Sequence, residues 1–248
     1  MKPRSEQSQQ PEALGQLQRD GFAFLRGGEL RTQLLASGDL SDWAAFAESW
    51  NRLAIDPYLA ATGRRRLRRH GVFRLHPSGV LEQQPAQAHF QTVENNILQG
   101  GIERWFEPLE PRVAASRALE ALVKFGGDAF DALDDGATPR EWRVEVHQFR
   151  IEAHLDQAGE PTPEGAHRDG VDWVFVALID RVNISSGTTT VHRPDGLLLG
   201  SFTLERPLDA ALVNDRRILH GVTPVKAFDP SLPAYRDVMV VTYTALDR

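Results

Sequence analysis

The sequence contains a histidine and an aspartate two positions apart twice, at residues 154–156 and at residues 167–169. Because the chain has no cysteine, a transition-metal site in it must use histidine and carboxylate ligands. Two histidines and one carboxylate on one face of an octahedral ion leave three positions open, as in non-haem Fe(II) oxygenases. A His-x-Asp pair can supply two such ligands, with the third on a later strand, so the pattern indicates metal-centred chemistry.

Three features favour His167 and Asp169 over the first pair. Asp169 is followed by Gly170, which allows the backbone to approach closely, and a long apolar segment begins at Trp173. A further histidine, His220, lies on a later predicted strand and can supply the third ligand. The alternative is a set of ordinary core or surface histidines, because eight histidines among 34 acidic residues produce such pairs by chance.

One arginine fits the same chemistry. Arg236 stands at the start of the last predicted strand. Its planar guanidinium can bind a carboxylate through two hydrogen bonds and stays charged when buried, which suits a dicarboxylate cosubstrate that chelates the metal at its other end. The alternative for Arg236 is an ion pair at the rim, with Asp237 or Asp229.

The candidates for binding a substrate come from the strand that precedes these residues. Apolar and polar residues alternate over residues 142–146, which predicts a half-buried strand. Gln148 and Arg150 continue its apolar face, so we expect them to point inward. Arg168 lies between two candidate ligands and is the third candidate. Packing or pairing at the rim is the alternative for each of the three.

The elements that must position these residues are mainly strands. After the strand that begins at residue 142, the alternation and the Gly, Pro and Asn-Asp signals predict strands at residues 173–179, 188–192, 196–204, 210–213, 216–225 and 237–245. Many short strands with helices gathered towards the N-terminus predict a mainly β fold, a double-stranded β-helix or jelly-roll barrel buttressed by helices.

Two helices are predicted in the first half. One follows Ser41 as N-cap, has apolar residues at helical spacing over residues 43–54, and ends at Asp56-Pro57. The other begins at Pro111 and stops at Gly126-Gly127. We expect residues 1–10 to be a flexible tail and residues 11–248 to be a single domain, helix-rich over 11–140 and jelly-roll over about 141–248.

The composition is that of an ordinary globular protein. The 248 residues carry 28 Lys+Arg against 34 Asp+Glu, a net charge of −6, and 41% of them are hydrophobic. There is no apolar run of the roughly 20 residues that a membrane span needs, and the polar start lacks the apolar stretch of a signal peptide. These features predict a soluble, cytoplasmic protein with no membrane partner, and they do not indicate an oligomeric state.

Three stretches of the C-terminal half form an ordered set: PTPEGAHRDGVDWVFVALIDRVNI (161–184), DRRILHGVTPV (215–225) and YRDVMVVTY (235–243). They resemble a bacterial family of 2-oxoglutarate- and Fe(II)-dependent dioxygenases, which includes free L-amino-acid hydroxylases of the L-isoleucine 4-hydroxylase type. The resemblance extends upstream to QRDGFAFLRG (18–27), FQTVENNILQGGIERWFEPL (90–109) and HQFRI (147–151), so it covers nearly the whole chain.

The resemblance implies a role for each candidate. His167, Asp169 and His220 would be the iron ligands, and Arg236 would bind the distal carboxylate of 2-oxoglutarate. Fe(II), 2-oxoglutarate and O2 would be used to hydroxylate a small substrate, an L-amino acid, with release of succinate and CO2. Where the family has paired glycines and an acidic residue, this chain reads SSGT at residues 185–188, so the resemblance specifies the cofactors more closely than the substrate.

Other functions stay open at this point. Residues 64–69 hold five arginines, which can bind nucleic-acid phosphates and would suit a dioxygenase that acts on nucleic acid. The run has no interleaved aromatic residue, so we expect a solvated, salt-bridged face instead. A dioxygenase acting on protein, a hydrolytic metalloenzyme and a non-catalytic jelly roll that binds a small ligand are further alternatives.

Overall fold

The computed structural model describes residues 9–60, 64–133, 139–154 and 157–246. Residues 1–8 of the expected tail lie outside this part of the chain, and the first helix already begins at Gln9. The helices are α1 (Gln9–Asp20), α2 (Gly27–Ser37), α3 (Trp43–Glu48), the 3-10 helix η2 (Ser49–Arg52), α4 (Pro57–Ala60), α5 (Pro111–Ala114) and α6 (Arg117–Asp131). In the described residues no helix is long and apolar enough to cross a membrane.

The described strands form one large antiparallel sheet and two small ones. The large sheet has the order β1-β10-β6-β13-β5-β3-β2, with β4 paired to β3. Its strands are β1 (Phe22–Leu25), β2 (Ala54–Ile55), β3 (Arg66–Leu75), β4 (Leu81–Gln83), β5 (Trp142–Glu152), β6 (Trp173–Val182), β10 (Ala210–Asn214) and β13 (Tyr235–Ala245). The small sheets are β11 (Leu219–Val222) with β8 (Thr188–His192) and β9 (Leu198–Thr203), and β12 (Val225–Ala227) with β7 (Ile184–Ser186).

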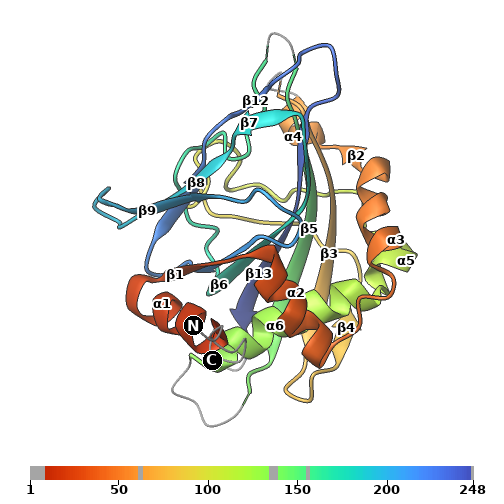
Figure 1. Cartoon of the computed structure of the whole chain (residues 1–248), viewed down its shortest axis with the longest axis vertical. Coiled ribbons are helices and arrows are strands. Elements are labelled where there is room, and N and C mark those ends of the chain that lie inside the picture. The colour runs from red at the N-terminus through yellow and green to blue at the C-terminus, as the bar shows by residue number, and fades with distance from the viewer. Residues whose placement is uncertain (1–8, 61–63, 134–138, 155–156, 247–248) are drawn as a thin grey trace, which may run out of the picture.

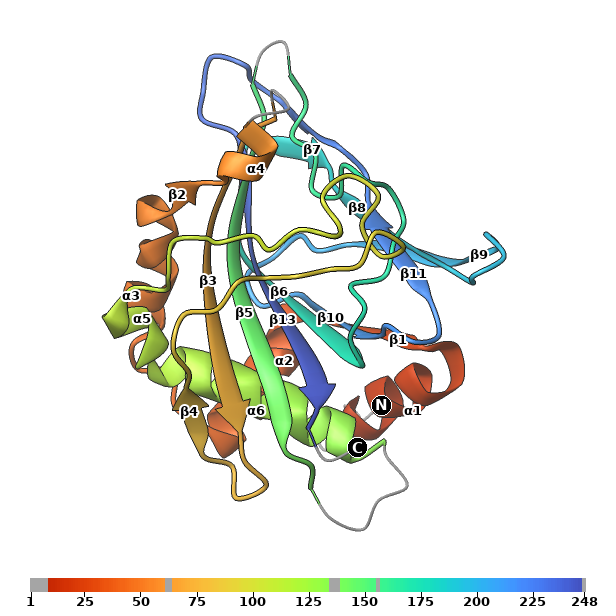
Figure 2. The same cartoon turned by 180° about the vertical axis from the view of Figure 1, so that it is seen from behind.

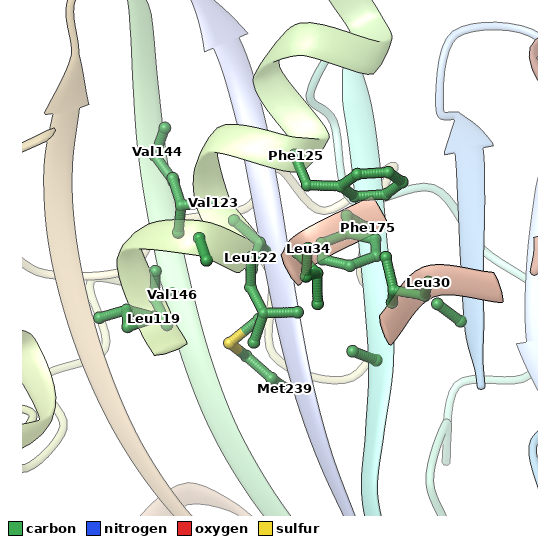
Figure 3. Packing of buried hydrophobic residues seen from close by; sticks show 14 of the residues in the cluster. Leu30, Leu34, Leu119, Leu122, Val123, Phe125, Val144, Val146, Phe175 and Met239 are labelled. Atoms are coloured by element: carbon green, nitrogen blue, oxygen red, sulfur yellow. The ribbon is translucent and has the colours of Figure 1, made fainter. Parts of the chain in front are cut away.

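The two faces of the large sheet have different neighbours. Helices α2 and α6 cover one face (Figure 1), and the long loop between β4 and α5 crosses the other (Figure 2). The main hydrophobic core lies under the helices, because the alternating apolar residues of β5 point to that side. Figure 3 shows this packing for Leu119, Leu122, Val123 and Phe125 of α6 against Val144, Val146 and Met239 of the sheet.

The architecture confirms the predicted mainly β class with helices, and the strands predicted after residue 140 are present. The expected segment 216–225 contains two strands, β11 and the start of β12. Strands β1 and β3 come from the part that was expected to be helix-rich, yet both join the large sheet.

The helix predicted from Pro111 is interrupted and runs past its predicted end. A new helix, α6, begins after Ser116, whose Oγ accepts a hydrogen bond from the backbone N–H of Leu119 at 3.4 Å. It continues through Gly126 and Gly127 to Asp131. These glycines do not end the helix; they allow close packing, since a Cβ on Gly126 would lie 2.3 Å from the hydroxyl of Tyr243.

The earlier helix is shorter than predicted and has a different cap. It ends as the 3-10 helix η2, before Asp56-Pro57, and its N-cap is Asp42 instead of Ser41. The Asp42 carboxylate accepts the backbone N–H groups of Arg117 and Ala118, at 2.9 and 3.0 Å, so it ties α3 to the start of α6.

Candidate metal centre

Backbone pairing brings the two predicted histidine ligands together. His167 and His220 form an isolated antiparallel bridge in which each N–H donates to the other's carbonyl at 2.9 Å. Directly paired residues point to the same side, so the two imidazole rings lie with their centroids 4.8 Å apart. The strand pairing therefore explains how histidines distant in sequence become neighbours.

Asp169 completes the predicted set of three. Its Oδ1 lies 3.7 Å from His167 Nε2, and its Oδ2 lies 3.5 Å from His220 Nε2. The three donor atoms all lie within 4.8 Å of one another. Two imidazole nitrogens and one carboxylate at this separation match the donor set of a facial triad for Fe(II).

The surroundings orient the imidazole rings for metal binding. His167 Nδ1 donates to the carbonyl of Gly165 at 3.0 Å, which places one proton on Nδ1 and makes Nε2 the nitrogen that would bind a metal. His220 Nδ1 is buried without a hydrogen-bond partner in the described residues, 3.9 Å from Asp215 Oδ1. In both rings the nitrogen that faces Asp169 is Nε2.

Asp215 anchors the loop that carries the candidate ligand Asp169. Its two oxygens accept the backbone N–H groups of Asp169, Gly170 and Val171 at 2.9, 2.8 and 3.1 Å. Gly170 has a φ of 84°, and a Cβ there would lie 2.2 Å from Asn95 Nδ2, so the position requires glycine. Sequence reasoning missed Asp215, although it is the first residue of the motif that contains His220.

The charges of the triad are strongly coupled. Although burial opposes it, the hydrogen bond and negative charge of Asp169 raise the pKa of His167 to about 9. Burial and the neighbouring His167 lower the pKa of His220 to about 4. In the absence of metal, one imidazolium therefore balances the buried carboxylate, and a dication bound here would replace that proton.

Gln91 holds the other side of the ligand carboxylate and was not predicted. Its Nε2 donates to Asp169 Oδ1 at 3.1 Å. Its Oε1 accepts from Asn96 Nδ2 at 3.0 Å and from Arg104 Nη2 at 2.7 Å. Gln91 lies in the loop between β4 and α5, so the loop that crosses the sheet helps to orient the candidate ligand Asp169.

The triad lines a cavity between the large sheet and strands β8 and β11. Arg236 lines the same cavity, with 2% of its surface exposed and its Nε without a hydrogen-bond partner. Burial and the nearby Arg181 lower its pKa to about 10. Arg236 does not form the ion pair with Asp237 that was its alternative. Asp237 lies on the opposite face of β13, where its Oδ1 and Oδ2 accept hydrogen bonds from Arg150 Nε and Nη2 at 2.8 and 2.6 Å.

Gln148 and Arg150, expected to point inward as candidates for binding a substrate, are not among the residues that line this cavity. They do share the apolar face of β5, but that face packs against the helices: Gln148 Nε2 donates to Ser49 Oγ at 2.8 Å. The opposite face, with His147, Phe149 and Ile151, lines the cavity. Arg168 is half-buried beside the ligands and is not among the residues that line the cavity.

The arginine run is only partly the solvated face that we expected. Arg66 binds the buried Asp56 at 2.8 Å. Arg68 is 3% exposed and lies between two aromatic rings, 3.5 Å from the ring centre of Phe106 and 4.7 Å from that of Phe149. Both arginines line the cavity, because alternate residues of β3 point to its interior.

Beside Arg68 lies a second group of metal-ligand residue types, here called the Glu145 cluster: His70, His89, Glu145 and His147. Glu145 Oε2 accepts from His70 Nε2 at 3.0 Å and from His89 Nδ1 at 2.9 Å. His147 Nδ1 accepts from Arg68 Nη2 at 2.7 Å. This cluster was not predicted, because its members come from three separate segments of the chain and no short motif connects them.

Comparison with known proteins agrees with this geometry. The 2OG-Fe dioxygenase family model matches residues 47–242. Over 233 residues the chain is 26% identical to the 3(1)-hydroxy-L-isoleucine 4-dioxygenase of Pantoea ananatis (strain AJ13355), which covers 92% of this chain and 93% of that relative.

Solved structures show the same fold. The crystal structure of a bsmA homologue from Methylobium petroleophilum PM1 superposes with a TM-score of 0.85 at 37% identity, covering 96% of this chain and 93% of that one. IDO from Bacillus thuringiensis gives a TM-score of 0.78 at 17% identity, covering 96% and 100%. These similarities confirm the predicted jelly-roll fold.

Proposed function

Because the chain belongs to the 2OG-Fe dioxygenase family, whose members use Fe(II), 2-oxoglutarate and O2, we propose that it hydroxylates a free L-amino acid. The observation that carries the proposal is one cavity lined by two histidines, one aspartate and a buried arginine that lacks a carboxylate partner in the described residues. A metal ligand set and an anion site in a single cavity are what this reaction requires.

The three ligands would hold Fe(II) through His167 Nε2, Asp169 and His220 Nε2. Bound there, Fe(II) with 2-oxoglutarate and O2 would supply the oxidising power to convert a C–H bond to C–OH, with one oxygen atom going to the alcohol and the other to succinate as CO2 is lost. The protein orients the ligands, through the Gly165 carbonyl and Gln91 in particular.

Arg236 would bind the distal carboxylate of 2-oxoglutarate. A buried guanidinium without an acidic partner is costly, and a bound carboxylate offsets that cost with charge-assisted hydrogen bonds. The residue also fixes which end of 2-oxoglutarate faces the metal, because the opposite end must then reach the triad.

The remaining wall of the cavity suits an aliphatic side chain. Its apolar residues include Val176, Leu204, Ala211, Val213, Val238 and Val240. Such a surface excludes water from the reacting C–H bond and packs against a hydrocarbon chain. It supports an aliphatic amino acid as substrate, in line with the name of the Pantoea relative.

The test is succinate release by the Fe(II)-loaded protein with 2-oxoglutarate, ascorbate and each of the twenty L-amino acids. We expect at least one aliphatic amino acid to stimulate succinate release and to gain one oxygen atom, detected by mass spectrometry. If single-stranded DNA, RNA or a peptide stimulated the reaction and no free amino acid did, the proposed substrate class would be wrong.

A further inference from the structure

Three buried arginines line the cavity: Arg68, Arg104 and Arg236. Among the described residues, no carboxylate lies within ion-pair distance of Arg104 or Arg236, and the nearest to Arg68 is Asp56 at 3.8 Å. The cavity therefore has more cationic sites than the 2-oxoglutarate carboxylate at Arg236 accounts for. A buried charge without a partner is costly unless a ligand supplies the opposite charge.

Arg104 is the cation best placed to receive such a ligand. It is 2% exposed, and neutral amide oxygens hold its guanidinium: Nη1 donates to Gln99 Oε1 at 2.8 Å and Nη2 to Gln91 Oε1 at 2.7 Å. Its Nε is buried without a partner in the described part of the chain. A guanidinium has five N–H donors, so several remain for a carboxylate.

The cavity also has one carboxylate beyond the metal ligand. Glu164 lines it with 11% of its side chain exposed, and its Oε1 lies 3.4 Å from His167 Nε2. Arg104 and Glu164 both line this cavity. An anion site and a cation site thus lie on the wall of one small cavity.

We propose that Arg104 binds the α-carboxylate and Glu164 the α-ammonium group of the amino-acid substrate, so that the enzyme selects free zwitterions. The inference rests on the proposed function and names the substrate class more narrowly. It excludes peptide-bound residues, whose backbone has neither charge, and amines without a carboxylate.

The position of Arg104 also limits the size of the substrate. A single side chain, Gln91, connects Arg104 to the ligand Asp169 through hydrogen bonds of 2.7 and 3.1 Å. A substrate carboxylate bound to Arg104 would therefore be separated from the carboxylate of Asp169 by Arg104 and the side-chain amide of Gln91. A substrate that bridges this gap is a single amino acid, and its side chain extends over the apolar wall.

The experiment compares free L-amino acids with their C-terminal amides, which keep the ammonium group and lose the negative charge. Succinate release is measured for all twenty pairs. For the most active amino acid, calorimetry of the anaerobic protein loaded with Fe(II) and 2-oxoglutarate then gives binding without turnover. We expect the amide to bind about tenfold more weakly or worse, because a charge-assisted hydrogen bond is lost.

Variants distinguish direct binding from a structural role. Arg104→Gln should weaken binding of the acid and leave that of the amide nearly unchanged, whereas Arg104→Lys keeps the charge and should retain part of the preference. Glu164→Gln should bring the amino acid and its 2-hydroxy-acid analogue to similar affinities. The matched control is Arg65→Gln, directly before β3, whose side chain is 59% exposed; it should keep the wild-type preference.

Two results would overturn the inference while the proposed function stands: the wild type binds acid and amide equally, or Arg104→Gln weakens both by the same factor. If no free amino acid stimulates succinate release, the proposed function itself is wrong and the zwitterion site is wrong with it.

Discussion

The chain builds two histidine–carboxylate groups beside one cavity, which all three triad residues line but only His89 and His147 of the Glu145 cluster do. The two groups differ in how their carboxylates are hydrogen-bonded. In the triad of His167, Asp169 and His220, the imidazole nitrogens that face Asp169 lie 3.5 and 3.7 Å from its oxygens. In the Glu145 cluster, a single carboxylate oxygen accepts short hydrogen bonds of 2.9 and 3.0 Å from two histidines. The two groups contain similar residue types, but they differ in the distances between imidazole nitrogens and carboxylate oxygens and in the N–H groups that donate to each carboxylate.

Two cations distinguish the groups further. Arg143 donates to the second oxygen of Glu145 at 2.9 Å, and Arg68 donates to His147 at 2.7 Å. A divalent ion bound there would have to displace N–H groups and sit beside two guanidiniums. In the triad a dication would displace a single imidazolium proton, and no hydrogen bond of the described residues joins a guanidinium to any of its three members. Ligand type alone therefore does not define a metal site; the hydrogen bonds and charges around the ligands also decide it.

Removing a triad ligand should have the largest effect. His167→Ala or Asp169→Ala should reduce substrate-dependent succinate formation by a factor of about 100 or more, because the metal loses one of three ligands. His192→Ala, at a histidine outside both groups, is the matched control and should behave as the wild type. Turnover unchanged in either ligand variant would remove the triad from the mechanism.

Changing Arg236 should have the next largest effect. Arg236→Gln should raise the KM for 2-oxoglutarate by a factor of about 10 to 100, since a charged hydrogen bond to a carboxylate contributes about 1.5–3 kcal/mol. Steady-state kinetics with varied 2-oxoglutarate measures this change. A variant that altered only the KM for the amino acid would show that the cosubstrate binds to another arginine.

Changing the Glu145 cluster should affect stability and leave the metal in place. Glu145→Gln removes the charged acceptor that two buried histidines share, and we expect the free energy of unfolding to fall by about 2 kcal/mol. Urea denaturation at pH 7 measures the loss. An unchanged stability, or loss of bound iron from the folded variant, would contradict the purely structural role of this cluster.

The smallest expected effect is on how the stability difference between the wild type and Glu145→Gln varies with pH. Although burial opposes it, hydrogen bonds from His70 and His89 hold the pKa of Glu145 well below its usual value. The stabilisation is therefore fully present above the unfolded-state pKa of about 4.5 and is lost as the pH falls towards the folded-state pKa. The stability difference between wild type and Glu145→Gln should shrink below about pH 4.5; a difference that grew would reverse the assigned charge.

The strands and the three predicted ligands were accessible from the sequence because alternation and local motifs are short-range features. The sequence did not specify which face of a strand would line the cavity. Strand β5 is covered on both faces, by helices on one side and by the cavity on the other, so parity could place Gln148 and Arg150 together but could not choose the side. The strand's apolar face packs against the helices, and the face that lines the cavity contains His147.

The loop residues of the candidate site could not be predicted from the sequence either. Gln91 and Arg104 lie in a segment without helical or strand periodicity, and their roles depend on how the loop crosses the sheet. The same loop leaves Trp105 55% exposed, whereas core burial is the usual expectation for tryptophan. Long-range contacts of this kind depend on register and loop path, which short-range patterns do not specify.

The most direct test of the central claim is the Fe(II) stoichiometry of the wild type, His220→Ala and Glu145→Gln, titrated anaerobically. The account predicts one Fe(II) per chain in the wild type and in Glu145→Gln, and none bound with comparable affinity in His220→Ala. Two ions per chain, or iron that survives His220→Ala and is lost in Glu145→Gln, would show that the metal binds at the other group of histidines.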